Sequence, residues 1–289
     1  METDLQTMAH EIIDLCKRGA ELNYSAKYRK GNLINLPGRG QVVITGDLHG
    51  HRRNFEKTVA FAELQNNPET YLIFQEILHG GPEDEFGGCL SFELFFDIVR
   101  YQLQFPDQVY LILGNHDTAI INDNNVLKAG KEMNQAMKDA MKRYYADDYE
   151  SVILAIKLYL LSQPLAVRSF NRIWMSHSLP ADRYVDDFDT EVLEKPLHPS
   201  DIARPNAAYL LTWGRRHSEE ALSKLANLFD VDFFILGHQP QETGFAYAGQ
   251  NLIILASDHN HGCLISFDLA KSYSIDKLIE CIVPLASIA

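Results

Sequence analysis

Two apolar runs in this chain each end in a short polar motif. The run at 41–45 is followed by Gly-Asp-Leu-His-Gly at 46–50, and the run at 109–113 is followed by Gly-Asn-His-Asp at 114–117. Short apolar runs bounded by turn residues are typical of buried strands. The sequence therefore predicts strands whose ends present carboxylate, imidazole and amide groups. This favours a fold that gathers strand ends around one site.

Histidines occupy the same kind of position further along the chain. His177 and His238 each follow an apolar run. In α/β sheets, ligands bind beyond the carboxyl ends of the strands. Carboxylate, imidazole and amide oxygen together suit a transition metal such as Mn, Fe or Zn. A ligand set this large indicates two ions, which together can clamp a phosphate and lower the pKa of a water between them.

Charge and cysteine content disfavour several classes of protein. The chain has 26 basic and 39 acidic residues, a net charge of −13, which disfavours non-specific binding to nucleic acid or to an anionic membrane. The cysteines form no Cys-x-x-Cys pair, so they resemble neither a disulfide framework nor a zinc knuckle. The first residues do not resemble a signal peptide, and no uncharged apolar stretch approaches about 18 residues. We expect a soluble, cytoplasmic protein.

Hydrophobic periodicity predicts the order of the elements. Helices are expected at 4–22, 52–65, 91–104 and about 217–229, with one or two more within 126–162. Strands are expected at 41–46, 71–74, 109–113, about 165–169 and 172–176, and near 232–236, 252–256 and 263–267. Segments 31–40, 79–88 and 180–206 are expected to be loops.

This order predicts an α/β fold with two mixed sheets. The first half alternates strand and helix, which favours parallel pairing with crossover helices. The second half has closely spaced strands, which favours antiparallel pairing. Two mixed sheets covered by helices accommodate both halves. We expect a single domain over residues 1–289, in which residues 1–40 form an N-terminal helical extension.

Taken in order, the motifs resemble those of the calcineurin-like metallophosphoesterases, specifically the phosphoprotein phosphatase type. The resemblance runs from about residue 40 to residue 269. It includes the motifs at 46–50 and 114–117, and His177, Arg204-Pro205, Leu211-Thr212-Trp213, Gly237-His238-Gln239 and the segment 257–263. The resemblance implies an α/β/β/α sandwich of two mixed sheets flanked by helices.

The resemblance also implies roles for individual residues and for two divalent metal ions, Mn and/or Fe with Zn as a further candidate. A first ion would be held by Asp47 and His49. A second would be held by Asn115, His177 and His238. Metal-activated water would attack the phosphate, and His116 would protonate the leaving oxygen as general acid, a role that suits a side chain titrating near neutral pH.

The second motif of the family, Gly-Asp-x-x-Asp-Arg-Gly, is altered at 75–81. Glu76 stands where the metal-bridging carboxylate belongs, and it remains a candidate metal ligand. His79 replaces the Asp that orients the acid histidine, so it is a candidate to hydrogen-bond His116 or to contact substrate. Asp117 is a second candidate to supply the missing carboxylate. Gly80 replaces the arginine that grips phosphate.

Several cations are candidates to replace that arginine. Arg215 and Arg216 follow Trp213-Gly214, and Arg52 and Arg53 follow the first motif. Among the remaining histidines, His259 lies in the segment that resembles the loop over the active site, together with His261, and His51 follows the first motif. We expect Arg215, Arg216 and His259 to contact substrate.

Three functions follow as hypotheses. The first is a metal-dependent phosphoesterase that hydrolyses phosphate monoesters, a Ser/Thr protein phosphatase-like enzyme acting on phosphoserine and phosphothreonine proteins or on a small phosphoester. The second is a dinucleoside polyphosphate hydrolase, for which Phe245 and Tyr247 are the available aromatic side chains. The third is a degenerate phosphatase fold that binds phosphorylated partners without turnover, which the altered segment 75–81 favours. The sequence predicts no oligomeric state.

Overall fold

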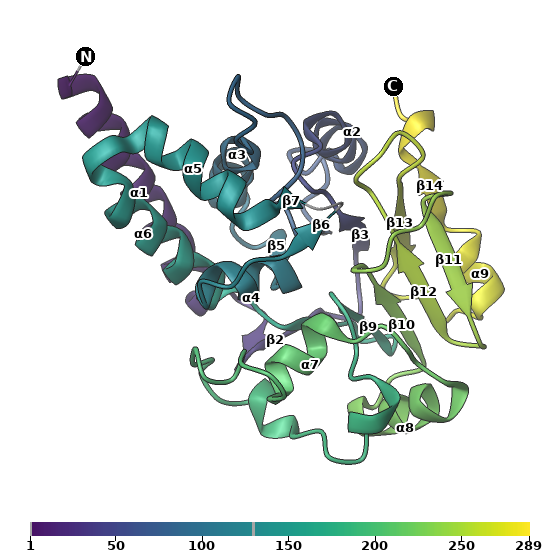
Figure 1. Cartoon of the computed structure of the whole chain (residues 1–289). Coiled ribbons are helices and arrows are strands. Elements are labelled where there is room, and N and C mark those ends of the chain that lie inside the picture. Colours follow the sequence, from purple (N-terminus) through teal and green to yellow (C-terminus); the bar gives the residue numbers. More distant parts are fainter. Residues whose placement is uncertain (1, 129–130) are drawn as a thin grey trace.

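A computed structural model of the chain describes residues 2–128 and 131–289. Two mixed sheets lie face to face and are flanked by helices (Figure 1), which confirms the predicted fold class. The five-stranded sheet has the order β14 (Ile282–Pro284), β13 (Cys263–Asp268), β3 (Gln41–Asp47), β4 (Thr70–Gln75) and β5 (Val109–Ile112). The seven-stranded sheet has the order β1 (Arg29–Lys30), β2 (Leu33–Asn35), β8 (Ala166–Arg168), β9 (Ile173–Ser176), β10 (Phe233–Leu236), β12 (Leu252–Leu255) and β11 (Phe245–Ala248).

Successive side chains along each strand point to opposite faces of the sheet, so the two faces contribute to two separate apolar layers. Val42 and Ile44 of β3 pack between the sheets, against residues such as Ile253 of β12. Val43 points to the opposite face of the sheet, which the helices cover. Strands buried on both faces read as continuous apolar runs, which explains why β3, β4 and β5 are so apparent in the sequence.

Helices cover the outer faces of the sheets. Their bounds are α1 (Glu2–Ser25), α2 (Arg52–Ala62), α3 (Ser91–Gln104), α4 (Asn115–Ile121), α5 (Met133–Tyr145), α6 (Tyr149–Ser162), α7 (Ala207–Trp213), α8 (Glu219–Phe229) and α9 (Ile275–Ile279). Phe55 of α2 contacts Phe74 of β4, which places α2 on the five-stranded sheet. Trp174 of β9 stacks on Phe229 of α8 with ring centroids 4.2 Å apart, which places α8 on the seven-stranded sheet.

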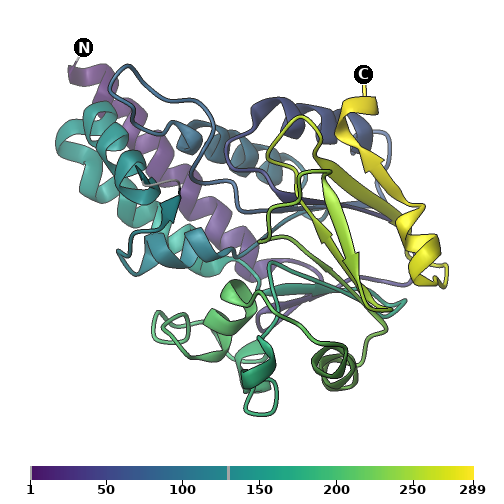
Figure 2. The same cartoon turned by 45° about the vertical axis from the view of Figure 1, so that its right-hand side comes forward.

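Residues 2–40 are tied to the rest of the chain. Helix α1 lies along α6 and α3 (Figures 1 and 2). At its end, Asn23 Nδ2 donates to Ser162 Oγ of α6 at 2.8 Å, and Gln102 Nε2 of α3 donates to Asn23 Oδ1 at 2.8 Å. Strand β2 then pairs in parallel with β8. The single-domain organisation stays a prediction, and these buried contacts support it.

Several elements differ from the sequence prediction. Helix α4 begins inside the motif that was expected to be loop, and β2 lies in the predicted loop at 31–40. A hairpin of β6 (Leu127–Lys128) and β7 (Lys131–Glu132) replaces the start of the helix predicted from residue 126, of which residues 129 and 130 lie outside the described part. Short elements such as α7, β11 and β14 were also missed, because each has too few residues to show a period.

The predicted antiparallel pairing of the second half is only partly right. Strand β9 pairs in parallel with β10, and β10 pairs in parallel with β12. Helix α8 and the long loop before it connect β9 to β10, which is the crossover that parallel pairing requires. The antiparallel pairs of this half are β8 with β9, β11 with β12, and β13 with β3 and β14.

Among the described residues, no helix is both long enough and apolar enough to span a lipid bilayer.

Candidate metal centre

Strand ends from both sheets converge on one small cavity. Asp47 ends β3, Glu76 follows β4, and Asn115 and His116 begin α4 after β5. From the other sheet, His177 follows β9 and His238 follows β10. The cavity has a volume of about 150 Å³, and its walls include Asp47, His49, Glu76, Asn115, His116, Arg215, His238 and Asp258. Most of the residues predicted from the sequence as ligands therefore lie together.

The two sheets meet at Asp47 because Gly46 allows a very close approach. A Cβ atom at Gly46 would lie 2.2 Å from the carbonyl oxygen of Leu255 on β12. The Gly46 N–H donates to Ser257 Oγ at 2.9 Å, and Asp47 forms a bridge with Ala256. A larger residue at position 46 would push the sheets apart at the point where Asp47 enters the cavity.

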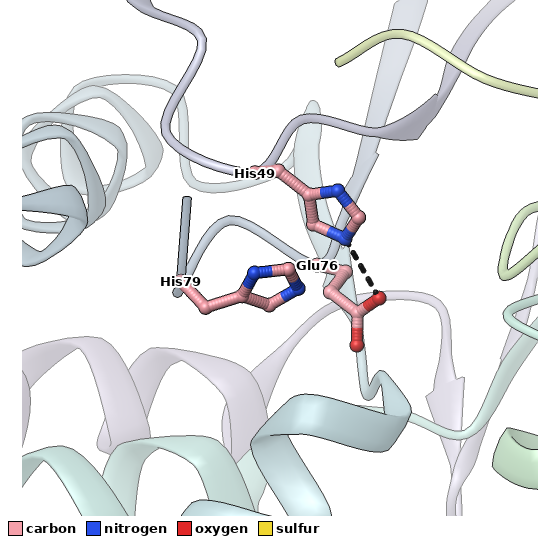
Figure 3. Close-up of side chains that lie close together, drawn as sticks. All are labelled: His49, Glu76 and His79. Atoms are coloured by element: carbon pink, nitrogen blue, oxygen red, sulfur yellow. Dashed lines mark hydrogen bonds and ion pairs between the residues drawn. The ribbon is translucent and has the colours of Figure 1, made fainter. Parts of the chain in front are cut away.

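Two groups of side chains lie close enough to hold a metal ion. Asp47, Glu76 and His177 bring one donor atom each within 4.8 Å of one another, and so do His49, Glu76 and His79. Figure 3 shows the second group, in which His49 Nε2 lies 3.2 Å from Glu76 Oε2. Glu76 is the residue that the two groups share.

Hydrogen bonds determine which nitrogen of His177 faces Asn115 and Glu76. Gln75 Nε2 donates to the Thr45 carbonyl at 2.8 Å, so the amide oxygen of Gln75 faces His177 Nδ1, 3.1 Å away. An amide oxygen only accepts, hence Nδ1 carries the proton and Nε2 carries a lone pair. Nε2 lies 2.9 Å from Asn115 Oδ1 and 3.5 Å from Glu76 Oε2. Acceptors facing one another in this way fit a bound cation.

His49 is oriented in the same manner by a carboxylate. Its Nδ1 lies 2.8 Å from Asp258 Oδ2, which leaves Nε2 facing Glu76 and Asp47. Burial lowers the pKa of His49, but the hydrogen bonds to Asp258 and Glu76 and the charge of Asp47 outweigh it and raise the pKa to about 9. Carboxylate–histidine pairs of this kind are common behind metal ligands.

The buried carboxylates also fit a cation. Burial, and then the charge of Glu76, raises the pKa of Asp47 well above its usual range. Burial lowers the pKa of His177 to about 4. A divalent ion would relieve the repulsion between the two carboxylates and would bind the imidazole in its neutral form. The residues present therefore fit the divalent ions that the resemblance implies.

His79 is fully buried and lies between two other imidazoles. Its ring centroid is 3.5 Å from that of His116 and 3.9 Å from that of His49. Its backbone N–H donates to Ser91 Oγ at 2.8 Å. Four residues of the site have positive φ, namely His49, Glu76, His79 and His238. This conformation is sparsely populated by non-glycine residues and is enriched at functional sites.

Asp117 contacts the start of α4. Its Oδ2 accepts the Gly114 N–H at 2.9 Å, and the carboxylate lies at the positive end of the helix. Burial, followed by the charge of Glu76, raises the pKa of Asp117 to about 7. The contact gives this residue a part in holding the helix that carries Asn115 and His116. Its catalytic role stays a prediction.

The candidate substrate-binding residues separate into different places. Arg215 lines the cavity together with the ligand set. Arg216 lines a neighbouring cavity instead. His259 Nε2 lies 2.8 Å from the Gln241 carbonyl, and His259 is not among the residues that line the metal cavity. Arg52 Nη2 forms an ion pair with Asp97 Oδ2 at 2.8 Å.

The remaining sequence candidates also lie away from the cavity walls. His51 caps α2 by accepting the Asn54 N–H through Nδ1. Phe245 and Tyr247, the aromatic residues considered for nucleotide stacking, belong to β11 and do not line the metal cavity.

Gln75 and Asp258 were missed as site residues. Asp258 is the one acid in the segment 257–263, which the motif order places over the active site. Gln75 is a polar residue at the end of β4, directly after the apolar run at 71–74. Each lies in or next to a motif and carries an acceptor oxygen, but many other residues share that signal.

A comparison with protein families identifies the family of this chain. The family model described as calcineurin-like phosphoesterase matches residues 40–242. The chain belongs to this family. The match contains the six candidate ligands and His116, while Asp258 lies beyond it. Metallophosphoesterases use divalent metals, and the two ligand groups are where this member could hold them.

Individual relatives of this metallophosphoesterase agree. A serine/threonine-protein phosphatase of Caenorhabditis elegans is 22% identical over 270 residues, which are 88% of this chain and 54% of the relative. The chain thus spans about half the length of that relative. The match confirms the predicted resemblance to the phosphoprotein phosphatase type.

Solved structures share the fold at low sequence identity. A protein serine/threonine phosphatase of Saccharomyces cerevisiae, described as similar to human phosphatase PP5, superimposes with a TM-score of 0.66 at 14% identity, over 89% of this chain and 82% of the other. A cold-active protein-tyrosine phosphatase of a Shewanella species has a TM-score of 0.58 at 15% identity, over 82% and 77%.

Proposed function

We propose that this protein is a metal-dependent phosphatase that hydrolyses phosphate monoesters, with phosphoserine and phosphothreonine proteins as the favoured substrates. The observation that carries the proposal is the position of Glu76, whose carboxylate belongs to both groups of candidate ligands. Its place in both groups supports our proposal that this glutamate takes the role of the family's bridging aspartate. The C. elegans relative, named as a serine/threonine-protein phosphatase, favours this substrate class.

In this proposal the ligands form two overlapping sets. Asp47, His49 and Glu76 would hold one ion. Glu76 would hold the second together with Asn115, His177 and His238. Mn and Fe, with Zn as a further candidate, suit this mixture of carboxylate, imidazole and amide donors. When bound, such ions neutralise phosphate charge and lower the pKa of water.

The protein's own groups would handle the substrate. His116 lines the cavity, and its backbone N–H donates to Glu76 Oε1 at 2.7 Å, so the acid is held next to the ligand set. In our proposal its imidazole protonates the leaving oxygen of the alcohol. Arg215 would contact the phosphate, in place of the arginine that Gly80 replaces. Its guanidinium suits this because it presents two parallel donors to phosphate oxygens.

The experiment measures hydrolysis of para-nitrophenyl phosphate by metal-stripped protein refilled with Mn²⁺. We expect Asp47→Asn and His238→Ala each to lose bound metal and activity. His116→Asn is expected to keep the metal and to lose about 10²–10⁴-fold in rate, the usual contribution of general acid catalysis. Metal content is measured on the same samples by atomic absorption.

Three results would contradict the proposal. Unchanged turnover in all three variants would show that the chemistry lies elsewhere. Two bound ions per chain without turnover of this substrate or of a phosphoserine peptide would instead favour a protein that binds phosphorylated partners without hydrolysis. Binding of one ion or none would show that Glu76 and His79 have dismantled the centre.

A further inference from the structure

A second cavity adjoins the metal cavity, and Arg215 lines both. The second cavity has a volume of about 480 Å³. Three more arginines line it, Arg183, Arg204 and Arg216. A substrate whose phosphate lies in the metal cavity therefore has this arginine cavity within reach of its neighbouring groups.

The cavity is basic in a protein that is acidic. The chain has 13 more acidic than basic residues, yet four arginines line this cavity together with one acid, Asp182. Asp182 Oδ1 accepts the Ser218 N–H at 2.8 Å and so serves the start of α8. In the part of the chain that the structure describes, none of the four arginines forms an ion pair, whereas Arg143 and Arg172 elsewhere do. Unpaired cations gathered in a cavity attract an anionic group.

The apolar wall of the cavity is hydrogen-bonded to helix α4. Tyr209 and Trp213 of α7 stack with ring centroids 5.5 Å apart and an interplanar angle of 11°. Trp213 Nε1 donates to Thr118 Oγ1 at 3.0 Å. Thr118 belongs to α4, the helix that begins with Asn115 and His116. A ligand held here would therefore keep a defined position relative to the acid and the metal ligands.

We propose that the arginine cavity recognises an acidic residue next to the phosphorylated residue of a peptide substrate. The inference rests on the proposed function and adds a substrate class to it, namely phosphopeptides with acidic flanking residues. Each extended residue advances a chain by about 3.3 Å, so a glutamate within a few positions of the phosphorylated residue reaches from one cavity to the next. Its carboxylate meets the arginines, and its methylene groups lie along the aromatic wall.

The test compares two phosphoserine peptides that differ only in having Glu or Gln at the positions flanking the phosphoserine. For the wild type, we expect KM to be about tenfold lower for the Glu peptide, because several exposed charge pairs each contribute a few-fold at most. In the double variant Arg183→Gln/Arg204→Gln, this difference should disappear. Hydrolysis of para-nitrophenyl phosphate should stay unchanged in that variant, since neither arginine lines the metal cavity.

A matched control and a binding measurement keep the test independent of turnover. Arg53→Gln removes an exposed arginine of α2 that lines neither cavity, and it should preserve the tenfold difference. Fluorescence anisotropy of the labelled Glu and Gln phosphopeptides should show the same preference in affinity for the wild type, and its loss in the double variant. If para-nitrophenyl phosphate is not hydrolysed but this preference in binding persists, the proposed function fails and the recognition site stands.

Two results would overturn the inference. Equal KM and equal affinity for the two peptides would show that the cavity does not read flanking charge. Inorganic tripolyphosphate that displaces the labelled Glu phosphopeptide at a hundredfold lower concentration than the unlabelled one would show that the cavity is built for a chain of phosphates and not for a peptide.

Discussion

At the scale of single residues, the centre depends on groups that orient the ligands as much as on the ligands. The amide of Gln75 can present only its oxygen to His177, because its nitrogen is engaged by the Thr45 carbonyl. Gly237 is required beside it, since a Cβ there would lie 2.6 Å from Gln75 Oε1 and 2.4 Å from Asp47 Oδ1. The orientation of His177 thus depends on an amide that is itself closely packed.

Replacing Gln75 by leucine tests this orientation. The variant keeps every proposed ligand but lets the imidazole of His177 turn, and partners behind a ligand typically contribute about 10–100-fold to metal affinity. We expect Gln75→Leu to weaken Mn²⁺ binding by that factor in calorimetric titration. Gln163→Leu removes another buried amide away from the cavity and should leave the affinity unchanged. Equal affinity in both variants would contradict the role.

Individual residues also show which parts of the site could be predicted from the sequence. Five candidate ligands could be predicted because each ends or follows a strand that is apolar on both faces. They are Asp47, His49, Asn115, His177 and His238. Gln75 and Asp258 could not be predicted, since orienting a ligand requires only an acceptor in the right place, and many residue types supply one.

At the scale of elements, helix α4 carries Asn115 and His116 into the cavity. It is a short helix that begins with three polar residues, so the sequence predicted a loop there. Its first turn is stabilised by the Asp117 carboxylate, which accepts the Gly114 N–H. Tertiary contacts and capping, rather than a visible apolar period, therefore determine this helix.

Loss of that cap should be measurable. Asp117→Ala leaves the Gly114 N–H without its acceptor, and we expect a loss of about 1 kcal/mol in the free energy of unfolding. Asp117→Asn keeps an oxygen that can accept and should lose less. Urea unfolding of the metal-free proteins at pH 7.5 gives both values. A smaller effect for Ala than for Asn would argue against a capping role.

At the scale of the whole molecule, the strands of the first half were predictable because they are continuous apolar runs linked by long helices. Pairing in the second half was not, since its strands are short and the same spacing suits either direction. The long loop at 180–206, predicted from its prolines and acids, has only short 3-10 turns. This loop leads into α7, so a segment without hydrophobic periodicity supplies a wall of the arginine cavity.

Stability at acidic pH should depend on histidines that fold in the neutral form. Burial lowers the pKa of His217, although its hydrogen bond to the Leu179 carbonyl acts in the opposite direction. As the pH falls, the unfolded chain therefore takes up a proton on this histidine at a higher pH than the folded chain does. The contribution of neutral His217 to the free energy of unfolding is complete above about pH 6.5 and is lost as the pH falls below that value.

The corresponding experiment compares urea midpoints at pH 7.5 and pH 5. We expect His217→Gln to lose less stability on acidification than the wild type, because glutamine keeps the donor to Leu179 and cannot be protonated. His10→Gln, at an exposed position of α1, should behave like the wild type. An identical pH dependence for His217→Gln and wild type would refute the assignment.

The meeting of the two sheets at Asp47 has a consequence for the order of folding. The hydrogen bond from the His238 N–H to Asp47 Oδ1 joins residues 191 positions apart, and that from the Gly46 N–H to Ser257 joins residues 211 apart. Contacts so distant in sequence form slowly, and long chains fold in stages. Strands β3 to β5 leave the ribosome long before His238 exists. The rate at which refolding protein takes up metal is therefore expected to report when the two sheets dock.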